Sequence, residues 1–201
     1  ALGGALLYEG AGDIVNCTFA ENEAVGGYDP GIPAAYFGAA ISGGSTGAGL
    51  DVRNTVFWNN RDTHQWTPMT CNVPAPMPGS DNFQWPRQRL DENGDPSSED
   101  DNPCTENVTW ADAELGAFGD HGGPTRTLVP NGGSVVIGAG NGCPATDQRG
   151  EPRPASGCTW RPPTRPSWRT GTRPASAGTR GGSTTSSCAT RAMPSRAGSS
   201  T

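Results

Sequence analysis

The sequence contains no lysine, and its last stretch, residues 159–201, contains neither an acidic residue nor any Leu, Ile, Val, Phe or Tyr. All 20 acidic residues lie before residue 159, together with seven of the 14 arginines, so the main body of the chain is acidic. Nucleic acid is therefore not an expected partner, because phosphate binding needs a basic surface. No apolar run approaches the roughly 20 residues of a membrane-spanning helix, and we expect no transmembrane segment.

Catalytic motifs are also missing. The sequence has only two histidines and no Gly-x-Ser-x-Gly elbow, metal-type histidine pair or phosphate-binding loop. One of the histidines, His121, lies in a glycine-rich stretch, which favours a role in a turn over a role in catalysis. We therefore expect no catalytic residue and no cofactor-binding residue.

Apolar residues are scarce, at 32% of the chain, against 30 glycines and 19 prolines. This share is below that of a usual globular domain, and it indicates a thin core with many turns. A stacked architecture fits this composition, because each layer of a stack buries only a few inward residues.

A short motif is present twice, 38 residues apart. Residues 16–22 read Asn-Cys-Thr-Phe-Ala-Glu-Asn, and residues 54–60 read Asn-Thr-Val-Phe-Trp-Asn-Asn. A glycine-led apolar string, Gly-Gly-Ala-Leu or Gly-Ala-Ala-Ile, precedes each copy. A repeated unit that cannot bury its apolar face alone predicts stacked β coils, and an ordinary antiparallel β protein is the alternative.

Stacking the two copies predicts which side chains meet. The phenylalanines would form a dry interior column, and the asparagines would form ladders, because a side-chain amide both donates and accepts hydrogen bonds. We expect six structural residues from these columns: Asn16, Phe19, Asn22, Asn54, Phe57 and Asn60.

The chain divides into four segments by composition. We expect β-helix coils over residues 1–62, a polar loop excursion off the stack over 63–110, a C-terminal segment with short strands at 128–130 and 134–137 over 111–158, and a tail over 159–201. The tail lacks the apolar residues that would offset the entropy of ordering it, so we expect it to be disordered.

Six cysteines are present, and none forms a Cys-x-x-Cys pair, which argues against a zinc or thioredoxin-type site. Two pairs bracket loops that a covalent link would stabilise, Cys71 with Cys104 and Cys143 with Cys158. Such disulfides would indicate an oxidising compartment. The alternative is free, partly buried thiols, and Cys17 fits that description best.

An acidic run supplies the one metal site that the sequence suggests. Asp91, Asn93 and Asp95 have the alternate spacing of a calcium loop. Pro96 stands where the EF-hand pattern has Gly, and Asn102 where it has a bidentate Glu. The sequence thus leaves two alternatives, a calcium ion bound by Asp91, Asn93 and Asp95 or a run of solvated charges.

Two sets of strings resemble known bacterial surface proteins. The glycine-led string and Phe-x-x-Asn, at residues 19–22 and 57–60, resemble the repeat motifs of chlamydial-type polymorphic outer-membrane proteins. Those proteins are secreted right-handed parallel β-helices, many of them adhesins. The strings Gly-Gly-Pro-Thr at 122–125 and Asp-Gln-Arg-Gly at 147–150 resemble the choice-of-anchor Q domain, which precedes a cell-surface anchor. Together the resemblance covers residues 1–158.

The resemblance implies an all-β, right-handed parallel β-helix with a non-catalytic function, on the bacterial surface or outer membrane or secreted from the cell. Residues 111–158 would cap the last open coil next to a cell-envelope anchor. The expected partners are that anchor and a host or matrix surface, glycans included. The rival is a carbohydrate-active β-helix enzyme, a polysaccharide lyase or glycoside hydrolase, which needs clustered carboxylates or a basic proton acceptor.

The beginning and the end of the sequence each lead to a prediction of their own. Ala1 stands next to the first glycine-led string, so we expect a fragment of a longer protein with further coils before it. After Cys158 the sequence departs from the family's usual ending, and a shifted reading frame over 159–201 would account for the change in composition. A basic arm that binds anionic polymers is the alternative.

Overall fold

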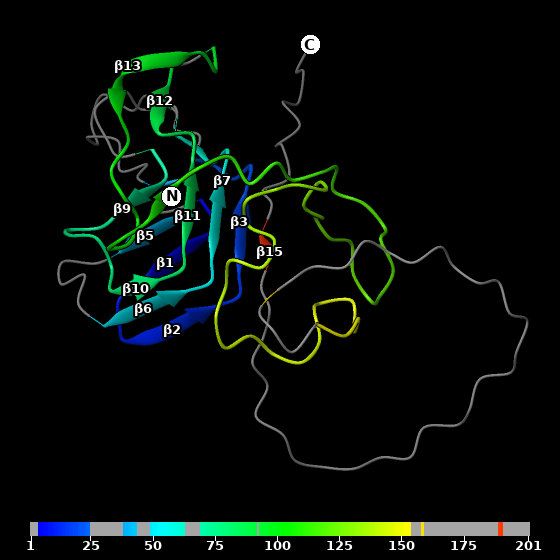
Figure 1. The fold of residues 1–201 in the computed structure, drawn as a ribbon. Helices are drawn as coiled ribbons and strands as arrows, with labels where there is room; N and C mark the ends of the chain where they lie inside the picture. The colour runs from blue at the N-terminus through cyan, green and yellow to red at the C-terminus, as the bar shows by residue number, and fades with distance from the viewer. Residues whose placement is uncertain are drawn as a thin grey trace, which may run out of the picture.

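The computed structural model describes residues 4–24, 38–43, 49–62, 69–91, 93–153, 158 and 189–190. Over these ranges the chain is all-β and contains no helix (Figure 1). These described parts accordingly include no helix that is long and apolar enough to cross a membrane.

The chain runs through the same arrangement of strands in successive passes, and each of the first three passes adds one strand to each of three parallel sheets (Figure 1). The first pass has β1 (Leu6–Tyr8), β2 (Gly12–Val15), β3 (Thr18–Ala20) and β4 (Glu23–Ala24). The second has β5 (Ile41–Gly43), β6 (Leu50–Arg53), β7 (Val56–Trp58) and β8 (Arg61–Asp62). The third has β9 (Cys71–Asn72), β10 (Gly79–Ser80) and β11 (Phe83–Trp85), and β14 (Thr109–Trp110) follows on the next pass.

Sheet A has the order β1-β5-β9, sheet B the order β2-β6-β10, and sheet C the order β15-β3-β7-β11-β14. A further parallel pair joins β4 to β8. The first and second passes pair in the register of the sequence repeat, with Ile14 opposite Val52 and Phe19 opposite Phe57. We call this set of passes the stack.

An apolar column runs through the interior of the first two passes. Phe19, Phe57 and Val52 are almost completely buried. The two phenylalanine rings stack, with centroids 5.3 Å apart and planes inclined by 11°. Burial of rings of this size is a major favourable term in a core this thin.

The corner that precedes sheet C has the same left-handed backbone in every pass. Its residues have φ angles near 50°, a region that asparagine and aspartate tolerate better than other side chains. They are Asn16 (φ 56°), Asn54 (φ 51°), Asp81 (φ 57°) and Asn107 (φ 54°). The asparagines of the sequence motif therefore set the geometry of a turn as well as bonding along the stack.

The structure corrects the interpretation of residues 63–110. We expected this segment to leave the stack, but β9, β10 and β11 pair with the second pass, and Phe83 lies opposite Val56. What projects is a smaller antiparallel hairpin, β12 (Gln88–Leu90) with β13 (Pro96–Asp100), which Figure 1 shows beyond the stack. Both faces of this hairpin are largely exposed to solvent, which agrees with its polar sequence.

Residues 111–153 with Cys158, which we call the strap, run along the outer side of sheet C (Figure 1). We expected them to cover the last open coil, but they contact the first three passes from the side, as the next subsection describes. Residues 135–138 form a turn, so the strand expected at 134–137 is wrong. Pro130 makes an isolated antiparallel bridge with Leu115.

The tail is also different from the expectation in one place. Ala189–Thr190 form β15, which pairs in parallel with β3 at the edge of sheet C. The predicted disorder is therefore wrong for these two residues, and the rest of 159–201 lies outside the described residues. Backbone pairing needs no large apolar side chain, which is why composition alone did not reveal this strand.

Candidate functional site

The strap is attached to the stack through the column of left-handed corners. The Asn54 side chain donates to the carbonyl of Asn141 (2.7 Å) and accepts from the Asn141 N–H (3.0 Å). The Asn141 side chain donates to Asp81 (3.0 Å), and Asn54 donates to Asn16 (3.2 Å). One strap residue is thereby bonded directly to the second and third passes, and through Asn54 to the first.

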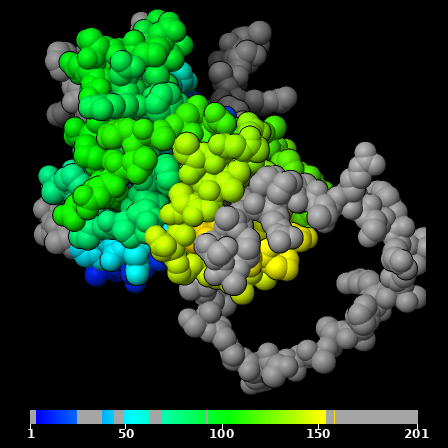
Figure 2. All heavy atoms as spheres, viewed as in Figure 1, coloured from blue at the N-terminus to red at the C-terminus, as the bar shows by residue number. Residues whose placement is uncertain are grey.

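A second attachment lies further along sheet C. The Trp58 indole N–H donates to the Asp112 carboxylate at 2.8 Å, and the same carboxylate oxygen accepts the N–H of Glu114. Apolar packing surrounds this contact, and it involves Ala20, Ala113, Leu115, Val56, Trp58, Leu128 and Val136. Figure 2 shows the strap lying against the side of the stack.

The Asp-Gln-Arg-Gly string at 147–150 forms a turn around the Asp147 carboxylate. One Asp147 oxygen accepts the N–H groups of Arg149 (2.8 Å) and Glu151 (3.1 Å). The other accepts two guanidinium N–H groups of Arg149 at 2.9 and 2.6 Å. The Arg149 side chain is only 4% exposed, so this charge-assisted pair is committed to holding the strap together.

The two strings that resemble the choice-of-anchor Q domain touch each other. Gly123 has a φ of +87°, and a Cβ atom there would collide with the backbone of Arg149. Gln148 donates to the Thr125 hydroxyl at 2.8 Å. The strings therefore form one structural unit within the strap, in which the glycine permits close approach and the polar side chains fix it.

A cavity of about 180 Å³ lies between sheet C and the strap. Its apolar lining comes from Val56 and Phe83 on sheet C and from strap residues such as Leu128. Its charged lining consists of Asp81, Asp147, Glu151, Arg149 and Arg153. Ligand pockets also combine apolar walls with a few polar groups, but their usual volume of about 300–1,000 Å³ is larger than that of this cavity.

Arg153 is the distinctive group of this cavity. Burial lowers the pKa of its guanidinium, and the positive charge of Arg149 adds to that effect, while the Asp147 carboxylate opposes it. Its Nε donates to the Thr146 carbonyl at 3.3 Å, and its two terminal nitrogens make no hydrogen bond with the other described residues. These nitrogens are chemically suited to a ligand carboxylate or hydroxyl.

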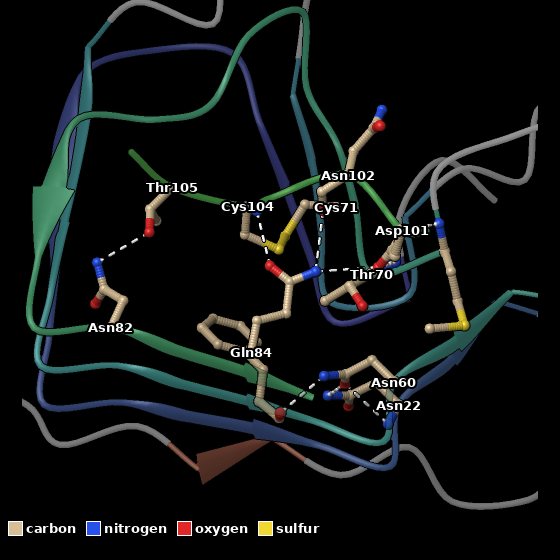
Figure 3. The surroundings of a disulfide bond; sticks show 12 residues. Asn22, Asn60, Thr70, Cys71, Asn82, Gln84, Asp101, Asn102, Cys104 and Thr105 are labelled. Atoms are coloured by element: carbon tan, nitrogen blue, oxygen red, sulfur yellow. Dashed lines mark hydrogen bonds between the residues drawn. A yellow bond between two sulfur atoms is a disulfide. The ribbon is translucent and has the colours of Figure 1, made fainter. Parts of the chain in front are cut away.

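The interior of the third pass contains a hydrogen-bonded network beside its buried apolar residues Cys71, Met77 and Cys104 (Figure 3). Gln84 is completely buried at the position that Phe19 and Phe57 occupy in earlier passes. It accepts the Cys104 N–H (2.8 Å) and donates to Asp101 (3.0 Å).

The Asp101 carboxylate also accepts the N–H groups of Met69 and Thr70 at 2.8 and 3.1 Å. Burial raises the pKa of this carboxyl, and the Met69 and Thr70 donors act in the opposite direction. The carboxylate links the end of the projecting hairpin to the beginning of the third pass.

Two disulfides join the cysteine pairs singled out in the sequence, Cys71–Cys104 and Cys143–Cys158, with Cα–Cα distances of 5.2 and 5.5 Å. The first lies inside the third pass beside Gln84 (Figure 3), and the second closes the end of the strap. Cys17 is also disulfide-bonded. The alternative of a free thiol, for which Cys17 was the best candidate, is therefore wrong.

The side chains proposed for calcium are at the tip of the projecting hairpin. One oxygen of Asp91 accepts the backbone N–H groups of Asn93 (2.8 Å) and Asp95 (2.9 Å). The N–H of Asp95 is the main cause of the lowered pKa of Asp91. No group of three or more His, Cys, Asp or Glu side chains suited to a metal occurs in the described part of the chain. Calcium here stays a prediction.

The asparagines expected in the second ladder are brought together inside the stack. The Asn22 side chain donates an N–H to the side-chain amide oxygen of Asn60 at 2.8 Å, and the Asn60 side chain donates to the backbone carbonyl of Phe19 at 2.9 Å. Both amides are buried. Together with the Asn16–Asn54 bond, these contacts tie the first pass to the second.

Sequence reasoning missed the third and fourth members of the repeat. Asp81 precedes Gln84 by three residues, and Asn107 precedes Trp110 by three, as Asn16 precedes Phe19. A pattern that allowed aspartate at the corner, and glutamine or tryptophan at the position of Phe19, would have detected them. Arg153 and Asn141 carry no comparable signal, because their roles depend on the path of the strap.

Comparison of the chain with protein-family models, with curated proteins and with solved structures finds no match. The class that the described residues define is therefore a structural one: an all-β stack of parallel strands with a strap along one side.

Proposed function

We propose that this chain is part of a non-catalytic bacterial protein, displayed on the cell surface or secreted, whose passes form a right-handed parallel β-helix. In this proposal residues 111–158 connect the helix to a cell-envelope anchor, as in the choice-of-anchor Q proteins that they resemble. The observation that supports it most is the attachment of Asn141 to the corners at Asn54 and Asp81.

A side attachment of this kind suits a mechanical connection. Force that enters through the strap is shared by the corner bonds, the Trp58–Asp112 bond and the apolar contacts around it. A cap seated only on the last pass would instead transmit force to a single strand pair, which could peel away. The geometry thus favours a load-bearing joint between a display scaffold and its anchor.

The disulfides also support an extracytoplasmic location. Cys71–Cys104 lies in the interior, and Cys143–Cys158 closes the strap. Such bonds persist in oxidising compartments such as the periplasm and the cell exterior. We propose the envelope anchor as one partner and a host or matrix surface, glycans included, as the other.

Surface display is testable with an epitope in the projecting hairpin, at the exposed tip next to Asn93. The full-length gene carrying this insertion would be expressed in its own bacterium, with a cytoplasmic protein as the permeability control. We expect antibody labelling of intact cells, and loss of the label after brief external protease treatment. Labelling that requires permeabilised cells would contradict the proposal.

A carbohydrate-active function is the second candidate, and the cavity beside sheet C is the observation that favours it. Asp81, Asp147 and Glu151 line this cavity with Arg153. Glycoside hydrolysis needs two available carboxyl groups. Asp147 is engaged by Arg149 and Asp81 by Asn141, which leaves Glu151 as the less committed carboxylate. This arrangement suits binding of a sugar better than its hydrolysis.

Incubation with a panel of neutral and uronate-containing polysaccharides separates the two candidates. Release of reducing ends or unsaturated uronates would support the enzyme, provided that Glu151→Gln abolishes it and the exposed Glu106→Gln does not. The display function predicts no turnover by the wild-type chain.

A further inference from the structure

The first-pass edge of sheet C is occupied by a strand from the other end of the chain. β15 pairs in parallel with β3, with Ala189 opposite Thr18 and Thr190 opposite Phe19. More than 160 residues of sequence separate the two strands, so this pairing closes the longest loop of the described chain. Every other strand neighbour of sheet C belongs to the next pass along the chain.

The backbone direction of β3 identifies the groups that this strand covers. The Cys17 carbonyl accepts the Val56 N–H at 3.0 Å, and the Glu21 N–H donates to the Trp58 carbonyl at 2.9 Å. Because alternate residues of a strand point their N–H and C=O groups to opposite neighbours, those of Thr18 and Ala20 point away from the second pass. Thr190 stands opposite the residue between them.

The outward backbone groups of Thr18 and Ala20 would be open to pairing if no other strand lay beside β3. Phe19 and Ala20 are buried, so the strand is held rigidly in an extended conformation with its outer polar groups presented in a row. Such a row is a template for strand addition by another segment or another molecule. The backbone of Ala189 and Thr190 pairs with this row.

We propose that the outer edge of β3 is a strand-addition site and that its occupant is the segment of this same chain around Thr190. Cys17 directly precedes β3 and is disulfide-bonded, and Cys188 directly precedes β15 in the sequence. The pairs Cys71–Cys104 and Cys143–Cys158 use the other four cysteines. A link between Cys17 and Cys188 would retain the added strand, and it is part of the proposal.

Strand addition by backbone groups does not depend on how the tail sequence arose, and it is independent of the proposed surface function. Its consequence is that the tail shields the first-pass edge from pairing with other chains. Loss of the pairing should therefore expose a parallel edge and promote self-association.

The test uses the full chain with Thr190→Pro, which removes the backbone N–H opposite Phe19. Ser199→Pro, in the same tail, is the matched control. We expect amide exchange at Thr18 and Ala20 to become about tenfold faster in Thr190→Pro, the effect of losing one hydrogen bond of about 1.4 kcal/mol. Exchange at Val56 should not change, which shows that the stack is still folded.

A synthetic peptide of residues 184–193, with Cys188→Ser to prevent covalent capture, provides the second measurement. It should slow exchange at Thr18 and Ala20 in the Thr190→Pro chain and leave the Ser199→Pro chain unaffected. Non-reducing peptide mapping of the wild type should recover Cys17 and Cys188 in one linked pair. Equal exchange in the two proline variants, or a peptide without effect, would overturn the proposal.

Discussion

The first two passes and the third pass of the stack have the same backbone plan but differ at one interior position of sheet C. In the first two, Phe19 lies on Phe57 in an apolar column. In the third, Gln84 stands in the same register and makes hydrogen bonds with Cys104 and Asp101. The same strand register and the same left-handed corners thus accommodate either a phenylalanine ring or a hydrogen-bonded glutamine. We infer that the corners and the register determine this fold more than the chemistry of the interior side chain does.

The two interiors differ in how they tolerate change. An apolar column loses contact area when a ring is removed, and the cost follows the size of the cavity left behind. A buried polar network loses more than one bond when any member is removed, because the remaining partners are left unsatisfied. Four predictions test this difference, in order of decreasing size.

Phe57→Ala should have the largest effect. The side chain is completely buried against Phe19, and truncation of a buried aromatic residue costs about 3–5 kcal/mol. Chemical denaturation of both proteins measures the difference in the free energy of unfolding. Phe57→Leu, which keeps most of the volume, should cost less. A loss below about 1 kcal/mol for Phe57→Ala would mean that the apolar column does not stabilise the stack.

Removal of the interior disulfide should have the next largest effect. Cys71 and Cys104 are 33 residues apart, and breaking a loop of that size costs about 2–4 kcal/mol. The double variant Cys71→Ala/Cys104→Ala would be compared with Cys143→Ala/Cys158→Ala by thermal unfolding. We expect only the first variant to loosen the third pass, detected as faster amide exchange at Phe83. The same result in both variants would contradict the separate roles assigned to the two disulfides.

Gln84→Met tests the polar interior at nearly constant volume. It leaves the Cys104 N–H without an acceptor and removes one donor from Asp101, so it should destabilise the chain by about 1–3 kcal/mol. The measurement is equilibrium unfolding in urea, with the solvated Gln88→Met as control. A stabilised Gln84→Met chain would show that an apolar filling suits the third pass as well as the first two.

The buried carboxyl group of Asp101 should make the stability of the chain depend on pH, and this effect should be the smallest of the four. Burial raises the pKa of its carboxyl in the folded state, so the folded chain binds a proton more tightly than the unfolded chain. Its stabilising contribution is therefore complete below the unfolded pKa and is lost as the pH rises through the folded pKa. Acidification from about pH 7 to pH 4 should thus raise the free energy of unfolding of the wild type relative to that of Asp101→Asn, because asparagine does not titrate in this range. The prediction is contradicted if the free energy of unfolding of the wild type falls relative to that of Asp101→Asn on acidification.

Much of the first two passes was predictable from the sequence. The repeat of Asn16 and Phe19 at Asn54 and Phe57 indicates both the stacking and the register, because identical positions recur at one fixed spacing. The third pass was missed because Gln84 breaks the aromatic pattern and the spacing shortens from 38 to 27 residues. A search for identical residues does not detect a layer whose interior chemistry has changed.

The strap was harder to predict than the stack. The strings at 122–125 and 147–150 were recognisable, yet their contact depends on a fold-back of the chain that local patterns do not encode. The side attachment at Asn141 and the cavity around Arg153 depend on the same fold-back. Asn141 in a glycine-rich segment and Arg153 between two prolines look the same in sequence as solvated residues do.

Amide hydrogen exchange of Val56, Phe83 and Thr109 tests most directly that the passes form one continuous stack. Each of these N–H groups donates to the pass before it, at 3.0, 2.9 and 2.9 Å to the carbonyls of Cys17, Thr55 and Asn82. The account predicts that all three exchange slowly, with Phe83 protected to within about tenfold of Val56. Exchange of Phe83 and Thr109 at the rate of exposed loop amides, with Val56 still protected, would show that residues 69–110 leave the stack and would contradict the account.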